Sequence, residues 1–278
     1  MQNTQERLSQ PQRDLHRHVR YFVRLSRVRG WWDNLLHLTG TAYLLWDYLD
    51  QASIGAGGFA AYMGFVLCLL TGAYALNDVC DFSKDSVLYR DGRNQPHRKH
   101  SLIYALTMLV MGMILLPVAT RKTLALGIGV VTLLMGIAYS LPPMRLKERG
   151  GWGVTGGAAA QRPVHFLVFA AILGAWNWFT IVLTAWLFFG SLLSMLGHQI
   201  LDYNNDLAAG VRTFTADHGI QLSLRLCMVC AAGIGMMVLA PVAFAPITEA
   251  IPVVGLLAAL SLVYAGKGVH AMRIIRAA

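Results

Sequence analysis

The sequence predicts an all-α protein that crosses a membrane several times as a polytopic helical bundle. Of its 278 residues, 56% are hydrophobic and only 13% are charged, about half the charged share of a soluble domain. The mean hydropathy is +0.51. Too few polar residues remain to cover a water-exposed surface, and the chain lacks the polar tracts of a disordered protein. The composition therefore excludes a soluble globular fold.

Eight apolar runs are long enough to cross a membrane, because about 20 helical residues span about 30 Å. The runs lie near residues 32–49, 58–78, 101–118, 123–140, 154–175, 178–201, 223–244 and 249–266. The first is the least apolar, since it carries Asp33, His37 and Asp47. The second and sixth runs each lead directly into an acidic cluster, which predicts eight transmembrane helices in two four-helix halves.

The basic residues predict the orientation. With a cytoplasmic N-terminus, every Lys and Arg except Arg121, Lys122 and Arg162 falls on the cytoplasmic side, as the positive-inside rule requires. Both termini and the polar segments after the second, fourth and sixth helices then face the cytoplasm. Arg162 is intramembrane, which predicts an acidic or phosphate partner.

This distribution also explains the net charge of +9, so no nucleic-acid partner is expected. We predict an integral multi-pass protein of the plasma (inner) membrane, surrounded by membrane lipid. Residues 1–30 contain seven Arg and no apolar run, so they are not a cleavable signal peptide. They form a basic cytoplasmic segment, either an interfacial helix on the membrane surface or a solvated tail. Residues 31–278 form the transmembrane domain.

The acidic residues that stand out lie in two short stretches. Asp78, Asp81 and Asp85 are spaced i, i+3 and i+7, so on a helix they share one face. Asp202 and Asp206 form an i, i+4 pair. Ordinary solvated loop acids would explain either cluster alone. Two clusters at matching places in two halves favour a functional site, because charged residues at membrane depth are functional by default.

Divalent cations would relieve the repulsion among carboxylates that face one cavity. Mg²⁺ prefers a few carboxylates together with phosphate oxygens and water, and Asn77 and Asn205 can add amide oxygens. Zinc is not expected, because Cys227 and Cys230 form a CxxC pair inside an apolar run with no second pair, a setting that favours helix packing. The clusters therefore predict a site for hard divalent ions.

Basic residues near the clusters predict a phosphate partner. Arg145 and Lys147 lie in YSLPPMRLKERG, and Arg212 follows the second cluster. Arg and Lys would hold the remaining oxygens of a metal-bound diphosphate and stabilise charge on the leaving group. The alternative is that they only follow the positive-inside rule.

These residues together resemble the UbiA superfamily of intramembrane prenyltransferases. The stretch 77–85 matches the family's NDxxDxxxD motif, and 202–206 matches its DxxxD motif. The stretch 210–213 resembles the Gly-x-Lys/Arg-Thr continuation of the second motif, and 139–147 resembles the segment between the fourth and fifth helices. The resemblance extends over about residues 20–265.

The resemblance implies how the site residues divide their roles. It implies helices around a central cavity that opens to the cytoplasm and laterally to lipid, with two Mg²⁺ ions and a prenyl diphosphate between the motifs. The metal ligands would be Asn77, Asp78, Asp81 and the supporting Asp85 for one ion, and Asp202 and Asp206 for the other. The diphosphate contacts would be Asn77, Tyr139, Arg145, Lys147 and Arg212. The catalytic set would be Asp78, Asp81, Asp202, Asp206 and Lys147.

Two departures from the family pattern are visible. Gln95 stands in RNQP where the family commonly has Arg, so a phosphate contact is lost or passes to Arg93, His97 or Arg98. Family members commonly have nine helices, so the expected count is eight from the apolar runs, or nine if the family pattern is complete.

The expected function is Mg²⁺-dependent transfer of a prenyl group from a prenyl diphosphate to a small acceptor, an aromatic compound or quinone precursor. As the allylic C–O bond breaks, the carbon gains cationic character, and apolar and aromatic walls would exclude water and offer π-faces to it. The alternative enzyme is a membrane terpene cyclase, in which an internal double bond attacks the cation. A non-catalytic lipid transporter would explain the apolar helices but not the paired metal-type motifs.

Overall fold

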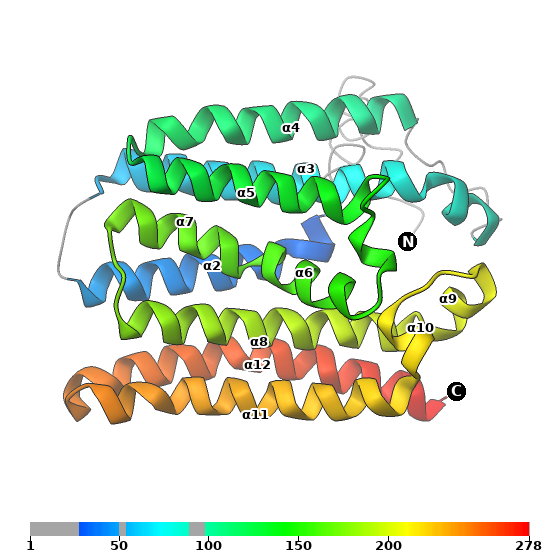
Figure 1. Cartoon of the computed structure of the whole chain (residues 1–278). Helices are drawn as coiled ribbons and strands as arrows, with labels where there is room; N and C mark the ends of the chain where they lie inside the picture. The colour runs from blue at the N-terminus through cyan, green and yellow to red at the C-terminus, as the bar shows by residue number, and fades with distance from the viewer. Residues whose placement is uncertain (1–27, 50–53, 89–97, 278) are drawn as a thin grey trace, which may run out of the picture.

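The structure, a computed structural model, describes residues 28–49, 54–88 and 98–277, with side chains over 31–49, 54–81 and 99–265. Every regular element in these ranges is helical (Figure 1). The greater part of the predicted basic segment and the departure at Gln95 lie outside the described residues.

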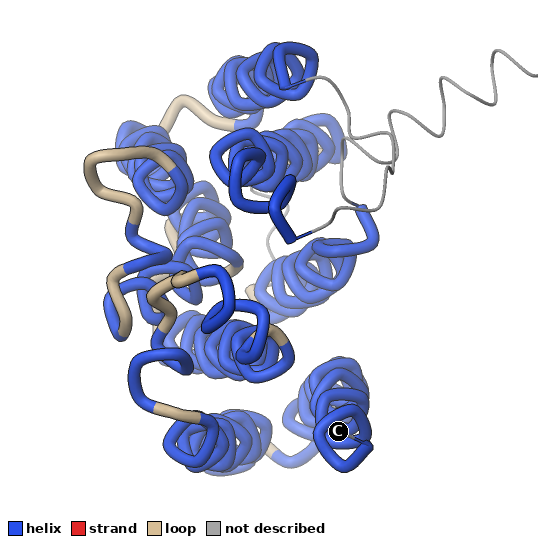
Figure 2. The backbone as a smooth tube through the Cα atoms, turned by 90° about the vertical axis from the view of Figure 1, so that its right-hand side faces the viewer, coloured by secondary structure: helices blue, strands red, loops and turns tan. Residues whose placement is uncertain are grey.

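The long helices run side by side along one common direction (Figure 1). In chain order they are α2 (Val28–Tyr48), α3 (Ala56–Leu88), α4 (Arg98–Ala119), α5 (Thr123–Ser140), α6 (Gly151–Gln161), α7 (Pro163–Leu173), α8 (Trp178–Leu201), α11 (Ile220–Phe244) and α12 (Ile247–Ala277). The short helices are η1 (Leu146–Glu148), α9 (Tyr203–Ala209) and α10 (Phe214–His218). Seen end-on, α3 and α4 lie at one edge of the bundle and α11 and α12 at the opposite edge (Figure 2).

Six helices in the described part of the chain are long and apolar enough to cross a membrane. They are Ala56–Asp81, Lys99–Ala119, Thr123–Ser140, Trp178–Leu201, Ile220–Phe244 and Ile247–Ala265. Their outward faces carry large apolar side chains, among them Val118 at 67% exposure and Leu239 at 63%. A surface this apolar suits lipid and not water. The chain is therefore an integral membrane protein, as its composition predicted.

The run expected as one helix over 154–175 is broken in two. The helix α6 ends at Gln161 and α7 begins at Pro163, with Arg162 between them at φ −135° and ψ −51°. Proline has no N–H to donate and its ring clashes with the preceding turn, so a helix cannot pass through it undisturbed. Each piece has 11 residues, and the two lie end to end between α5 and α8 (Figure 1).

Aromatic side chains from α3, α7 and α8 contribute to the core. Phe65, Phe166, Phe169 and Trp186 are all fully buried. These four aromatic side chains therefore pack in the core.

Close helix packing surrounds this core. A Cβ added at Gly72 would lie 2.8 Å from Leu109 and 3.1 Å from the Ala105 carbonyl oxygen. Small residues of this kind let membrane helices approach closely, and this one brings α3 against α4.

Candidate active site

Three polar segments meet at one end of the bundle. They are the last turns of α3, the loop 141–150 that contains η1, and α9 with α10 (Figure 1). The helix α3 contacts α9, and η1 contacts both α5 and α6. Both acidic motifs therefore lie at the same end, as predicted for the segments after the second, fourth and sixth runs.

The first acidic motif is bridged by a lysine. The ammonium of Lys147 donates to the Asn77 amide oxygen at 2.8 Å and to both carboxylate oxygens of Asp81 at 2.5 Å. Ser140 donates to the same Asn77 oxygen at 3.3 Å. The helix α3 continues unbroken to Leu88, so positions 78, 81 and 85 keep the predicted helical spacing. The side chain of Asp85 lies outside the described side chains.

The backbone of Lys147 is fixed by a glycine and an arginine. A Cβ at Gly153 would overlap the Leu146 carbonyl oxygen and lie 3.0 Å from that of Lys147, so only glycine lets α6 pack directly on η1. Arg149 donates to the carbonyl oxygens of Met144 at 2.5 Å and Pro143 at 2.9 Å. Together these contacts hold the loop over the end of α3.

Arg145 is the second cation on Asp81. Its guanidinium lies 3.2 Å from Asp81 Oδ1 and 2.9 Å from Glu148 Oε1. Its φ of +37° lies in the left-handed region. Residues other than glycine seldom adopt this backbone conformation, and those that do are concentrated at functional sites. Glu148 was not singled out from the sequence, although its i, i+3 spacing from Arg145 was a signal for this pair.

The second acidic motif does not lie on one continuous helix face. The helix α8 ends at Leu201, Asp202 caps it, and Asp206 belongs to α9. The backbone still makes one turn here, because the N–H of Asp206 donates to the carbonyl of Asp202 at 2.8 Å. Thr213 donates its hydroxyl to Asp206 Oδ2 at 3.0 Å and accepts from the N–H of Ala216 to cap α10. The threonine therefore links the motif to α10.

Arg212 forms a bidentate pair with Asp217. Its Nε and terminal nitrogen lie 3.3 Å and 3.2 Å from the two carboxylate oxygens. The hydrogen bond and charge of Asp217 raise the pKa of the guanidinium. The Arg212 side chain is 77% exposed, so water screens this pair. Asp217 was not predicted, since nothing in the local spacing marks it.

Tyr139 and Gln199, which lie near the site, connect neighbouring helices. Tyr139 packs with Val154 and Met195 in a small apolar cluster between α5, α6 and α8. Gln199 accepts from the N–H and hydroxyl of Thr215 at 3.1 Å and 3.3 Å, which ties α8 to α10. A diphosphate contact of Tyr139 stays a prediction.

The intramembrane arginine has the acidic partner that was predicted. Arg162 donates to Asp33 Oδ2 at 2.7 Å and to Ser191 at 3.1 Å. Its guanidinium lies 5.1 Å from the ring centre of Tyr264. The pair therefore joins the break between α6 and α7 to α2, α8 and α12, and both side chains are 1% exposed.

The side-chain oxygens of Asn77 and Asp81 are of the kind that a hard divalent ion binds. Within the described side chains, no three His, Cys, Asp or Glu are grouped closely enough to hold a metal. The oxygens of Asn77 and Asp81 nevertheless converge on one cation, the Lys147 ammonium. Carboxylate and amide oxygens are the ligands that such ions take.

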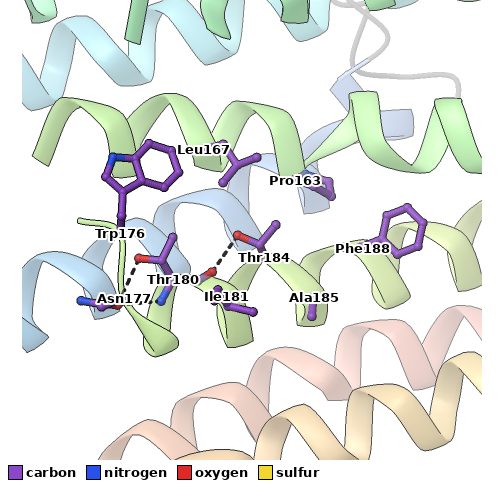
Figure 3. Close-up of a pocket in the computed structure, with 9 residues that line it drawn as sticks. All are labelled: Pro163, Leu167, Trp176, Asn177, Thr180, Ile181, Thr184, Ala185 and Phe188. Atoms are coloured by element: carbon purple, nitrogen blue, oxygen red, sulfur yellow. Dashed lines mark hydrogen bonds between the residues drawn. The ribbon is translucent and has the colours of Figure 1, made fainter. Parts of the chain in front are cut away.

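A groove of about 480 Å³ lies between α7 and α8, away from the acidic motifs (Figure 3). Trp176, Ile181 and Phe188 are among its lining residues. Two of its hydroxyls are turned to the backbone, since Thr180 donates to Ala175 and Thr184 to Thr180. The groove is therefore apolar and offers no charged group for catalysis.

The chain is similar to known proteins in sequence and in fold. The model of the UbiA prenyltransferase family matches residues 36–274. A structure of a UbiA homolog from Archaeoglobus fulgidus bound to GPP and Mg²⁺ has a TM-score of 0.70 at 18% identity, over 87% of this chain and 85% of that one. The same homolog bound to DMAPP and Mg²⁺ has a TM-score of 0.69 at 18% identity, with the same coverage.

A structure of digeranylgeranylglyceryl phosphate synthase in membranes is also similar. It has a TM-score of 0.60 at 16% identity, over 93% of this chain and 94% of that one. At these identities, the solved structures show a common fold. No curated protein sequence matches the chain.

Proposed function

The chain belongs to the UbiA prenyltransferase family, and on that premise we propose that it is a divalent-metal-dependent transferase that moves a prenyl group from a prenyl diphosphate to a small acceptor. One observation carries the proposal. Lys147 reaches across from the loop 141–150 to Asn77 and Asp81, at the bundle end that also holds the second motif. Similar folds solved with GPP or DMAPP and Mg²⁺ support it.

The two motifs would hold the metal. Asn77, Asp78 and Asp81, supported by Asp85, are proposed to bind one Mg²⁺, and Asp202 and Asp206 a second. A bound Mg²⁺ neutralises diphosphate oxygens and makes the diphosphate a better leaving group. In this chain Thr213 would orient the Asp206 carboxylate, since it already donates to Oδ2.

The basic side chains would hold the diphosphate and take up its developing charge. Lys147 and Arg145 lie on Asp81, within reach of anything bound there, and Arg212 is on the exposed side of the second motif. Fixed cations aimed at the leaving oxygens stabilise the charge that appears as the C–O bond breaks. Tyr139 would contact the diphosphate from α5.

The transmembrane arrangement follows from the same proposal. The six apolar helices, together with α2 and the α6–α7 pair, would make eight crossings of the plasma (inner) membrane. The polar end with both motifs would face the cytoplasm, because the basic residues gather there. The acceptor would be an aromatic compound or quinone precursor.

The test is an activity assay on purified protein in detergent. Wild-type protein with Mg²⁺ and geranyl or farnesyl diphosphate, plus a mixture of phenolic acceptors, should release pyrophosphate and form prenylated products detectable by mass spectrometry. Asp81→Asn should lower the rate about a hundredfold or more, as loss of one charge-stabilising group does elsewhere. Asp47→Asn, an exposed acid on α2, is the matched control and should leave the rate unchanged.

Three outcomes would redirect the proposal. Normal turnover by Asp81→Asn would remove the metal assignment at the first motif. A cyclic hydrocarbon formed without acceptor would make the protein a cyclase. Failure to bind or cleave any prenyl diphosphate would favour a lipid transporter.

A further inference from the structure

Lys147 occupies the place where a divalent ion would have to bind the first motif. Its ammonium is within hydrogen-bond distance of three oxygens, one from Asn77 and two from Asp81. Asn77 and Asp81 are two of the four side chains proposed to hold the first metal ion. A divalent ion on the same oxygens would lie next to the ammonium, and like charges at such short range repel strongly. Ion and lysine therefore exclude each other.

The Asp81 carboxylate already has two cationic partners. Lys147 and Arg145 both contact it, and Arg145 also pairs with Glu148. The Lys147 side chain is only 12% exposed, so water screens its contact with Asp81 less than it would at an open surface. A metal ion alone gains little here, because it must first displace a cation that is well placed.

Lys147 can leave Asp81 without a backbone change. Its stem of four carbons is flexible, whereas the backbone of η1 is held by α6 at Gly153. Arg145 can release Asp81 as well, because Glu148 already lies 2.9 Å from its Nε. An incoming anion would then pair with Lys147 in place of the Asp81 carboxylate.

We propose that Lys147 is an internal counter-ion that keeps divalent ions off the first motif until a diphosphate arrives, and that it then moves onto the diphosphate. This inference rests on the proposed function. One Lys147–Asp81 ion pair is exchanged for a metal–Asp81 contact and a Lys147–phosphate contact, so every charge stays paired. Metal and diphosphate consequently bind cooperatively, and by linkage each strengthens the other equally. Metal ions alone bind weakly.

The experiment measures Mn²⁺ binding to purified protein by electron paramagnetic resonance, with and without inorganic pyrophosphate. Lys147→Met removes the counter-ion and should tighten binding of Mn²⁺ alone about tenfold, within the usual range of coupling between sites. The enhancement by pyrophosphate should shrink in the same variant. Lys122→Met, an exposed lysine at the start of α5, is the matched control and should behave like the wild type. Lys147→Arg keeps the charge and should bind Mn²⁺ alone as weakly as the wild type does.

The outcomes separate this inference from the proposed function. A lysine that only shapes the site would give weaker or unchanged Mn²⁺ binding in Lys147→Met, and that result would overturn the counter-ion role while leaving the transferase in place. Tighter binding in Lys147→Arg would overturn it too. Wild-type protein that takes up no Mn²⁺ even with pyrophosphate would overturn the proposed function itself.

Discussion

Two ion pairs in this protein have similar N–O distances but differ in how far they are exposed to solvent. Arg162 and Asp33 meet at 2.7 Å with both side chains 1% exposed, whereas Lys147 and Asp81 meet at 2.5 Å with 12% and 21% exposed. The buried pair adds Ser191 and the Tyr264 ring as neighbours. The open pair shares its carboxylate with a second cation, Arg145.

The difference separates a structural charge from an exchangeable one. A buried charge is costly unless it keeps its partner. Arg162 therefore stays paired with Asp33, and the pair holds the break between α6 and α7 in place. Lys147 and Asp81 are partly exposed, so a ligand that arrives from solvent can reach both and give each charge a new partner. Asp81 is therefore suited to binding and Asp33 to holding helices together.

The largest effect is expected from breaking the buried pair on one side. Arg162→Met removes the guanidinium that lies 2.7 Å from the buried Asp33 carboxylate, which should lower the free energy of unfolding by about 3–5 kcal/mol. The double variant with Asp33→Leu should recover most of the loss. Denaturant unfolding in detergent measures both. A single variant as stable as the wild type would show that Asp33 is not held as an ion in the folded state.

Removing the negative charge from the Lys147–Asp81 pair should change the free energy of unfolding only slightly. Asp81→Asn should change the free energy of unfolding by only about 1 kcal/mol, because the asparagine amide oxygen can still accept a hydrogen bond from Lys147. A loss as large as that of Arg162→Met would erase the distinction between the two pairs.

An effect smaller than that of Arg162→Met is expected from moving the Lys147–Asp81 pair without changing any charge. Gly153→Ala pushes the carbonyl groups of Leu146 and Lys147 away from α6. Misplacing a catalytic group by about 1 Å can cost up to a hundredfold in rate. We expect about a tenfold loss in kcat/KM for the prenyl diphosphate, measured as pyrophosphate release. Gly156→Ala is the control on the same helix, because its nearest neighbour would be Leu146 Cδ1 at 3.8 Å. Equal activity in both variants would show that η1 tolerates displacement.

The smallest effect should come from the exposed pair of Arg212 and Asp217. Arg212→Gln should leave thermal unfolding unchanged, because the side chain is 77% exposed and surface pairs contribute little. The KM for the diphosphate should rise a few-fold at low salt, and the difference from wild type should fade as salt screens the charge. A KM that is independent of Arg212 at every salt concentration would remove this residue from the diphosphate site.

Much of the fold was predictable because the signals are local. A membrane helix satisfies its own backbone hydrogen bonds and needs only an apolar run of sufficient length, so α3, α4, α5, α8, α11 and α12 correspond to predicted runs. The break at Arg162 was missed although Pro163 follows it directly. A hydropathy average over the run 154–175 does not detect the missing backbone N–H of Pro163.

By itself, the sequence determined that the chain is a membrane protein and that it belongs with the prenyltransferases, and it predicted which residues would offer oxygen ligands to a metal ion. These properties depend on composition and on spacings of a few residues. Only the tertiary structure decided the partners: Lys147 with Asn77, 70 positions apart, and Arg162 with Asp33, 129 apart. Such pairs are set by how the helices pack in three dimensions. The sequence shows which charged residues are present, but it does not show which cation meets which anion.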